Sequence, residues 1–381
     1  PPPLRAETHE RAMGLGRDVP GVVVSDVRIS RSPEDLARHQ LTITIGASRY
    51  GALAYTDNRG TIQNARMRGY TSFNIASLAV PGDRLQVDLF TIPYERFRYG
   101  YGQVKASIPL NSDGLRASVS ASYGDQFQRL TGPNQHGMSR QLAGDVSYPF
   151  VKSRAFSLAG NFQIADWKSE QRRAGTTFQR DRIQVARAWL EAVRMTNMRL
   201  AGKLGVSRGF DLGPATDKGD GLASRPRAGS KFTKFNATFD LIAPLYGRAR
   251  LRLEASAQYS TTSLLAPEEY ALGGSRIGRA FDFNEVTGDD GFGGMLEMAV
   301  PLGDLKRGPK AMEIFGFVDG GGAFRKWAST GLPKEQWLAS TGLGTRFSAM
   351  GFMWAGEIGV PIANSGANRG VRAFFSLTRA F

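Results

Sequence analysis

The 381-residue chain contains no cysteine, which excludes disulfide bonds and thiolate metal sites. Its three histidines, His9, His39 and His136, lie far apart in the sequence and suggest no metal cluster, so we expect no cofactor. No run of about 18 apolar residues is present, which excludes a transmembrane helix. A membrane protein built from β-strands remains compatible with this pattern, because barrel strands alternate polar and apolar residues and give a weak hydropathy signal.

Acidic residues are scarce relative to basic ones, and the formal net charge is +15. A net positive charge is compatible with binding to nucleic acid or to an anionic membrane surface. The arginines are scattered singly along alternating segments and do not cluster on one predicted helix. This distribution favours the membrane, with lipopolysaccharide and outer-membrane lipid as expected neighbours and no nucleic-acid partner.

From about Ser48 onward, apolar and polar residues alternate with the period of a β-strand. In 249–259, every odd position is Ala, Leu or Tyr, while the even positions are Arg, Glu, Ser and Gln. A soluble β-sandwich enzyme would also alternate. The segments, however, run about ten residues, the length that crosses a bilayer at a tilt. Several of them also carry aromatics expected to form an interfacial girdle, namely Tyr123, Tyr148, Trp167 and Tyr259.

The alternation predicts an all-β transmembrane barrel of about sixteen antiparallel strands, an even number as bacterial barrels prefer. The expected strands are Arg49–Asp57, Ala65–Ser77, Asp83–Ile92, Tyr99–Pro109, Leu115–Tyr123, Gln141–Pro149, Ala155–Asp166, Arg182–Val193, Leu200–Phe210, Lys231–Ala243, Ala249–Ser260, Gly291–Val300, Ala311–Phe324, Leu338–Phe347, Phe352–Pro361 and Gly370–Phe381. Between two of them, the polar segment Leu212–Ser230 is rich in Gly and Pro. It is interpreted as a mobile surface linker, with contact to a transported substrate as the other possibility.

No catalytic constellation is visible, and the carboxylates are dispersed at polar strand positions, where lining of a lumen is the default explanation. The glycines around Gly278 and Gly320 are not followed by Gly-Lys-Ser/Thr, so a phosphate-binding loop is excluded. We therefore expect a protein that is not an enzyme.

Two short motifs stand out. The Gly-rich segment 269–302 contains Gly278-Arg279-Ala280-Phe281, and Phe317-Val318-Asp319-Gly320-Gly321 follows it. Weaker motifs lie at Asp57-Asn58-Arg59-Gly60 and at Ser147-Tyr148-Pro149-Phe150. In order and spacing, these motifs resemble the TpsB family, the outer-membrane transporters of two-partner secretion.

The resemblance implies a 16-stranded barrel with a loop folded into its lumen, here at about 262–290. In that family a Val-Arg-Gly-Phe/Tyr tetrad on the loop pairs its arginine with the aspartate of a Phe-x-Asp-x-Gly motif. Arg279 and Phe281 match the tetrad, whereas Gly278 and Ala280 depart from it; Phe317, Asp319 and Gly321 match the partner motif. The implied pair is Arg279 with Asp319. Taken alone, Arg279 is better explained as an ordinary loop arginine; the matching motif around Asp319 favours the pair.

The resemblance divides the chain into 1–46, the C-terminal part of an α+β POTRA domain, and the barrel 47–381. Before the barrel, the sequence predicts a helix over Leu4–Leu15, a Pro20-Gly21 turn and two strands, Val22–Ile29 and Leu41–Ile45. On pattern alone, any small α+β fragment fits equally well. No signal peptide is visible at Pro1, and we expect the first domain to be truncated.

The implied function is secretion of a partner protein, an adhesin or haemolysin-like and probably β-helical exoprotein, across the bacterial outer membrane, with the N-terminal domain in the periplasm. A second hypothesis is an insertase that assembles outer-membrane proteins, which would normally carry more POTRA domains upstream. A passive porin ranks lower, because porins lack the arginine tetrad and the POTRA-like start.

Overall fold

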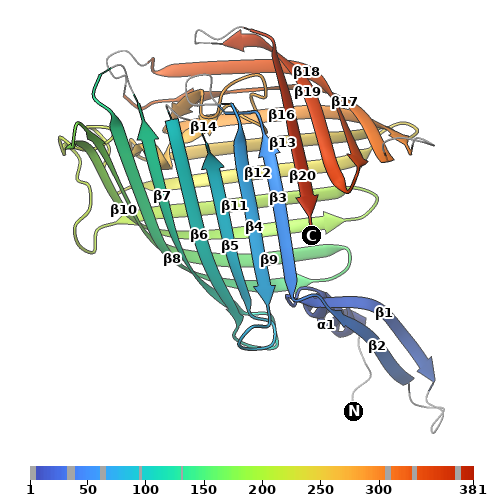
Figure 1. The fold of residues 1–381 in the computed structure, drawn as a ribbon. Helices are drawn as coiled ribbons and strands as arrows, with labels where there is room; N and C mark the ends of the chain where they lie inside the picture. Colours follow the sequence, from blue (N-terminus) through green and yellow to red (C-terminus); the bar gives the residue numbers. More distant parts are fainter. Residues whose placement is uncertain are drawn as a thin grey trace.

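The computed structural model describes residues 6–31, 39–60, 66–93, 97–129, 132–304, 310–327, 333–364 and 370–381. Sixteen antiparallel strands form one closed barrel, as predicted (Figure 1). They are β3 (Tyr50–Asp57), β4 (Arg68–Ala76), β5 (Arg84–Ile92), β6 (Phe97–Pro109), β7 (Arg116–Gln128), β8 (Gln135–Lys152), β9 (Phe156–Arg173), β10 (Thr176–Met195), β11 (Arg199–Phe210), β12 (Thr233–Pro244), β13 (Arg250–Ser260), β16 (Asp290–Gly303), β17 (Lys310–Phe324), β18 (Glu335–Ala349), β19 (Phe352–Asn364) and β20 (Arg372–Ala380).

The barrel closes where the last strand, β20, pairs with the first, β3. The ladder runs from Ser376 opposite Asp57 to Ala380 opposite Leu53. Phe381 extends it, because its main-chain N–H donates to the Ala52 carbonyl at 2.8 Å. Closure pairs both edges of the sheet, so among these strands no long row of unpaired backbone groups faces the lipid.

The wall is taller on one side, where β8, β9 and β10 contain 18 to 20 residues against 8 or 9 in β3, β4 and β5. The sequence predicted only about half of that length for β8. Its alternation of apolar and polar residues stops at Leu142, and Met138 is the one large apolar residue among 135–141. Backbone pairing continues past that point, from Gln135 opposite Arg173 to Lys152 opposite Ser157. A strand length predicted from apolar periodicity is therefore too short for a strand that extends beyond the apolar part of a membrane.

Side chains alternate between an apolar outer face and a polar inner face. On β13, Glu254 and Gln258 point inward and are buried, whereas Tyr259 points outward and is 58% exposed. Of the predicted girdle residues, Tyr123 also lies exposed on the outer face, but Trp167 does not belong to a girdle. Trp167 faces the lumen and packs against a buried apolar cluster inside the barrel.

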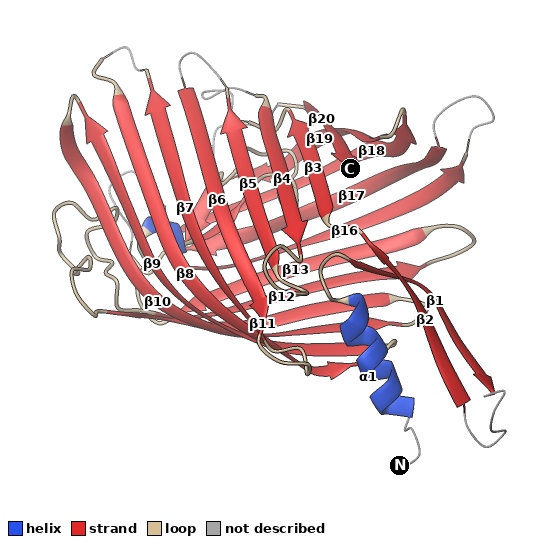
Figure 2. Ribbon diagram, turned by 60° about the horizontal axis from the view of Figure 1, so that its bottom comes forward, coloured by secondary structure: helices blue, strands red, loops and turns tan. Residues whose placement is uncertain are grey.

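One helix and two strands precede the barrel: α1 (Ala6–Arg17), β1 (Val22–Arg31) and β2 (His39–Ala47). The strands pair with each other in a two-stranded sheet, and the segment lies at one end of the barrel (Figure 2). Arg11 attaches α1 to the barrel by donating to the carbonyls of Phe150 near the end of β8 (3.2 Å) and of Asp113 in the β6–β7 turn (3.1 Å). Among the described residues, no helix is long and apolar enough to cross a membrane.

Candidate functional site: the loop inside the barrel

The loop between β13 and β16, residues 261–289, packs against the inner wall of the barrel, and we call it the lumen loop (Figure 1). It contains η1 (Ala266–Glu268) and two short strands that pair with each other, β14 (Tyr270–Leu272) and β15 (Val286–Gly288). Its apolar side chains form a buried cluster with the wall: Tyr270, Leu272, Ile277, Phe281 and Val286 from the loop, and Met295, Ala323 and Leu338 from the strands. The lumen loop therefore has a small apolar core of its own.

A tight turn places Arg279 against the wall. Gly278 has φ +82°, a conformation that favours glycine, and Phe281 N–H donates to the Gly278 carbonyl at 2.9 Å. A Cβ on Gly278 would also approach Leu338 Cδ1 to 2.9 Å, which is closer than real Cβ atoms pack. Glycine at position 278 thus both adopts the required positive φ and avoids a clash with Leu338.

The Arg279 guanidinium is buried between two glutamates of the inner wall. Its Nη1 donates to Glu297 Oε2 on β16 at 2.6 Å, and its Nη2 pairs with Glu357 on β19. Arg279 is 5% exposed, and its guanidinium lies 3.9 Å from the centre of the Phe317 ring. A cation removed from water in this way needs carboxylates and aromatic faces to compensate for lost hydration.

The same glutamates bind further arginines, so the charges form a continuous chain. Glu357 pairs with Arg59 from the β3–β4 loop, and Glu297 accepts two hydrogen bonds from Arg346 at 2.7 and 2.8 Å. Arg346 in turn reaches Glu313 at 3.0 Å, and Glu313 pairs with Arg250. We call this set of seven side chains the Arg/Glu chain: Arg59, Glu357, Arg279, Glu297, Arg346, Glu313 and Arg250.

The structure brings Arg279 and Asp319 together, but not through the guanidinium as predicted, because the guanidinium pairs with Glu297 and Glu357. Asp319 is buried and accepts the main-chain N–H of Arg279 at 3.0 Å and the hydroxyl of Ser340. The motif thus fixes the backbone of the turn, while the side chain reaches past it to Glu297 and Glu357. Both contacts connect the lumen loop to the wall, but through different groups.

The remaining motif residues surround this contact. Phe317 supplies the ring beside the guanidinium, and Gly321 leaves space for Leu272, whose Cδ1 would lie 2.9 Å from a Cβ there. Ala280 is buried, and its methyl group lies 3.1 Å from the position that a Cβ on Gly359 would occupy. Gly359 on β19 therefore leaves room for the methyl group of Ala280, which stands where the family tetrad has glycine.

The segment Leu212–Ser230, interpreted from the sequence as a mobile linker, instead packs against the barrel and the lumen loop. Ala228 and Phe232 join a buried cluster with Ala143, Ala165, Ile183 and Val185 of the wall and with Leu264 and Leu265 of the lumen loop. We call residues 211–232 the β11–β12 loop. Its high Gly and Pro content provides turns that let it follow the wall, and it does not prevent packing.

Ion pairs at the two ends of the lumen loop complete its attachment. Arg225 of the β11–β12 loop pairs with Asp289 and, at 3.0 Å, with Glu269. Glu268 pairs with Arg187 of β10 and accepts from Lys234 of β12 at 2.8 Å. Sequence reasoning missed these residues and the three glutamates of the Arg/Glu chain. The exception is Arg59, which lies in the Asp57–Gly60 motif that carried part of the family resemblance.

Chemically, the arrangement can hold a segment inside a pore by charge and apolar packing. Among the described residues, no group of three or more histidine, aspartate or glutamate side chains is placed to hold a metal ion. The site joins two loops to the barrel wall. This defines a closed β-barrel whose lumen contains an infolded loop.

The chain belongs to the haemolysin secretion/activation protein family ShlB/FhaC/HecB, whose profile matches residues 41–347. This family is of the TpsB transporter type, and its members are outer-membrane barrels. No curated protein sequence matches the chain.

Solved structures share the fold. CdiB from Escherichia coli superposes with a TM-score of 0.80 at 14% identity, covering 96% of this chain and 69% of that one. CdiB from Acinetobacter baumannii gives 0.77 at 16% identity, covering 96% and 67%. BamA from Haemophilus ducreyi lacking POTRA domains 1–3 gives 0.63 at 12% identity, covering 96% and 77%.

Proposed function

We propose that this protein secretes a partner protein across the outer membrane by two-partner secretion, with its N-terminal segment in the periplasm. Family membership supports transport. The single observation that carries the proposal is the burial of Arg279 between Glu297 and Glu357, which holds the lumen loop inside the pore. A passive porin has no need of an occluding segment attached by a buried ion-pair chain.

The N-terminal segment is suited to receive an unfolded client, and we assign it to the end of a POTRA domain. Every residue of β2 (His39–Ala47) is exposed, and β1 and β2 form a sheet of only two strands. An extended peptide can add to such a sheet by backbone hydrogen bonds, which tolerate many client sequences. The attachment of α1 through Arg11 keeps this sheet at the end of the barrel (Figure 2).

Passage of a client requires the lumen loop to leave its position. The loop belongs to no strand pair of the barrel wall, so its release leaves the ladder of sixteen strands intact. The Arg/Glu chain then determines how often the loop leaves. The exported client is a large secreted adhesin or haemolysin-like protein, and its folding outside the cell supplies direction without nucleotide.

The test uses the native host with the gene deleted and then restored as wild type or as Arg279→Ala. Mass spectrometry of the culture medium and cell surface should show one large protein lost on deletion, restored by the wild type and altered in amount by the variant. An unchanged set of secreted and surface proteins on deletion would contradict the proposal. Immunoblots and unheated gels confirm that the Arg279→Ala barrel is inserted and folded.

The likeness to BamA supports one second candidate, an insertase for outer-membrane proteins, with a TM-score of 0.63. The same deletion strain separates the two functions. Loss of many unrelated barrel proteins from the outer membrane indicates an insertase, whereas loss of one secreted protein with a normal set of barrels indicates two-partner secretion.

A further inference from the structure

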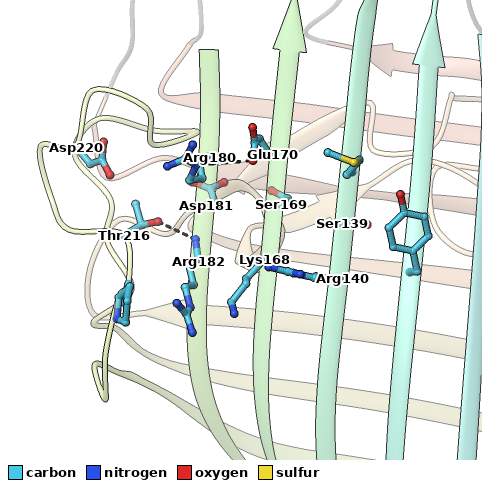
Figure 3. A pocket seen from close by; sticks show the side chains of 14 residues that line it. Ser139, Arg140, Lys168, Ser169, Glu170, Arg180, Asp181, Arg182, Thr216 and Asp220 are labelled. Carbon is cyan, nitrogen blue, oxygen red and sulfur yellow. Dashed lines mark hydrogen bonds and ion pairs between the residues drawn. The ribbon is translucent and has the colours of Figure 1, made fainter. Parts of the chain in front are cut away.

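Three basic side chains stand in one row on the outer face of the tall wall. In the strand register, Arg140 of β8 lies directly opposite Lys168 of β9, and Lys168 lies directly opposite Arg182 of β10. Figure 3 shows them across three neighbouring strands. They face outward, because they share their strand faces with exposed Leu142 and Ile164 and not with the buried lumen cluster.

The row marks the end of the apolar outer surface. Below it, the outward positions 142–150 of β8, 156–164 of β9 and 184–192 of β10 contain no charged residue. Each stretch is nine residues long, which matches the length of a tilted strand within the hydrocarbon region. The three cations therefore lie where lipid head groups meet the acyl chains. They are far along the wall from Lys152, the end of β8 that pairs with Asp18 next to α1.

The protein compensates only part of this charge. Asp166 is shared between Lys168, at 3.1 Å, and Arg182, at 3.3 Å. For Arg140, no ion pair is found among the residues that the structure describes. Like charges placed opposite each other on a sheet repel, so the row is unfavourable unless an anion lies between the side chains.

A pocket of about 550 Å³ opens over the row. Tyr123 borders it on β7, Arg180 and Glu170 border it above, and residues 214–216 of the β11–β12 loop form its side wall (Figure 3). The β11–β12 loop is fixed there, because the main-chain N–H of Arg182 donates to the Thr216 hydroxyl at 2.8 Å. The pocket thus has a cationic floor at the head-group level and continues into the apolar surface below.

We propose that this pocket binds the phosphorylated sugar head group of an outer-leaflet glycolipid with the chemistry of lipid A, its acyl chains lying on the apolar strand faces below. Arginine forks bind phosphate oxygens in a bidentate manner, and lysine adds a point charge. A sugar-sized head group fits the pocket volume, and the aromatic ring of Tyr123 offers a face to the sugar. The assignment to the outer leaflet depends on the proposed periplasmic position of the N-terminal segment. The assignment of a phosphorylated head group depends only on the residues of the pocket.

The test measures binding of bisphosphorylated lipid A to the detergent-purified protein by native mass spectrometry, with dephosphorylated lipid A and phosphatidylglycerol as comparisons. The triple variant Arg140→Gln, Lys168→Gln, Arg182→Gln should lose at least tenfold in affinity for the bisphosphorylated lipid. The single variant Arg140→Gln should show a smaller loss. Unheated gels establish that each variant retains a folded barrel.

A matched control removes three positive charges from the opposite rim: Arg154→Gln, Arg194→Gln and Arg248→Gln, all at exposed positions. It should bind lipid A within twofold of the wild type. Equal losses in both triple variants, or no loss in the first, would overturn the site. Equal binding of phosphatidylglycerol would overturn the glycolipid assignment and leave a general attraction for anionic lipids. Neither result bears on secretion.

Discussion

Replacement of Arg279 by alanine should release the lumen loop while the barrel stays inserted. Breaking a buried ion pair costs about 3–5 kcal/mol when it leaves an uncompensated charge. Here each glutamate keeps a second cation, since Glu297 retains Arg346 and Glu357 retains Arg59. We therefore take the lower value, about 3 kcal/mol, which shifts the ratio of released to bound loop about 100-fold. Arg279→Lys should recover little, because an ammonium cannot serve both glutamates in the planar geometry of the guanidinium.

Planar-bilayer conductance and a disulfide trap measure this shift. The chain has no cysteine, so the pair Ala280→Cys and Gly359→Cys introduces the only thiols. The Ala280 Cβ lies 3.1 Å from an ideal Cβ at Gly359, slightly under the usual 3.5–4.5 Å of disulfides. Oxidation should hold the loop in and keep the pore closed, and reduction should restore openings. Adding Arg279→Ala should slow disulfide formation and raise the open fraction of the reduced protein.

Arg276→Ala is the matched control, since Arg276 lies on the same loop but its side chain is 71% exposed and, among the described residues, pairs with Glu254, at 2.9 Å, which also keeps Arg252. It should change the open fraction little, because exposed ion pairs contribute at most about 1 kcal/mol. Equal effects of Arg276→Ala and Arg279→Ala, or normal conductance and trapping in Arg279→Ala, would refute the role of the buried pair.

Two further predictions follow from other contacts. The main-chain N–H groups of Val80, Ala79 and Leu78 hold the pKa of Asp83 in the β4–β5 turn below its usual value. Because this pKa is lower in the folded state, the ionised carboxylate stabilises the fold at pH values above the unfolded pKa of about 3.9. That stabilisation is lost as the pH falls through the folded-state pKa. Protection of these amides from hydrogen exchange, relative to the intrinsic rate at each pH, should therefore stay high from pH 7 to 5 and fall below about pH 4, whereas Asp83→Asn should show low protection throughout. Arg225→Gln should detach the β11–β12 loop from buried Asp289 and raise its cleavage by proteinase K at least tenfold; cleavage unchanged from the wild type would exclude this attachment.

The barrel could be predicted from the sequence because its strands bury one face in lipid. On β13, the alternation of Leu251 and Leu253 with Arg250 and Arg252 determines both the strand and its faces. The upper part of β8 could not be predicted this way. Above Leu142 the apolar alternation ends, and the strand continues through its backbone ladder, which has no sequence signature.

The partner of Arg279 illustrates a different limit. The Phe-x-Asp-x-Gly motif correctly brings Asp319 to the turn, but the sequence does not show whether the backbone or the side chain of Arg279 meets it. Glu297 and Glu357 occupy inward positions on two strands that are not neighbours in the barrel. A dispersed carboxylate on the inner face has the same sequence context whether it lines water or binds an arginine, as these two do at 18 and 78 residues from Arg279.

The Arg/Glu chain also determines which ions would cross the open pore. The lumen loop contributes one member, Arg279, while the barrel and the β3–β4 loop contribute three arginines and three glutamates. Departure of the loop removes one positive charge and leaves the wall balanced, with the carboxylate of Asp319 uncovered beside it. Together, the remaining Arg/Glu chain and Asp319 carry one net negative charge, so small cations should pass this part of the open lumen more readily than anions. A reversal potential measured across a salt gradient would then report the position of the loop by its sign.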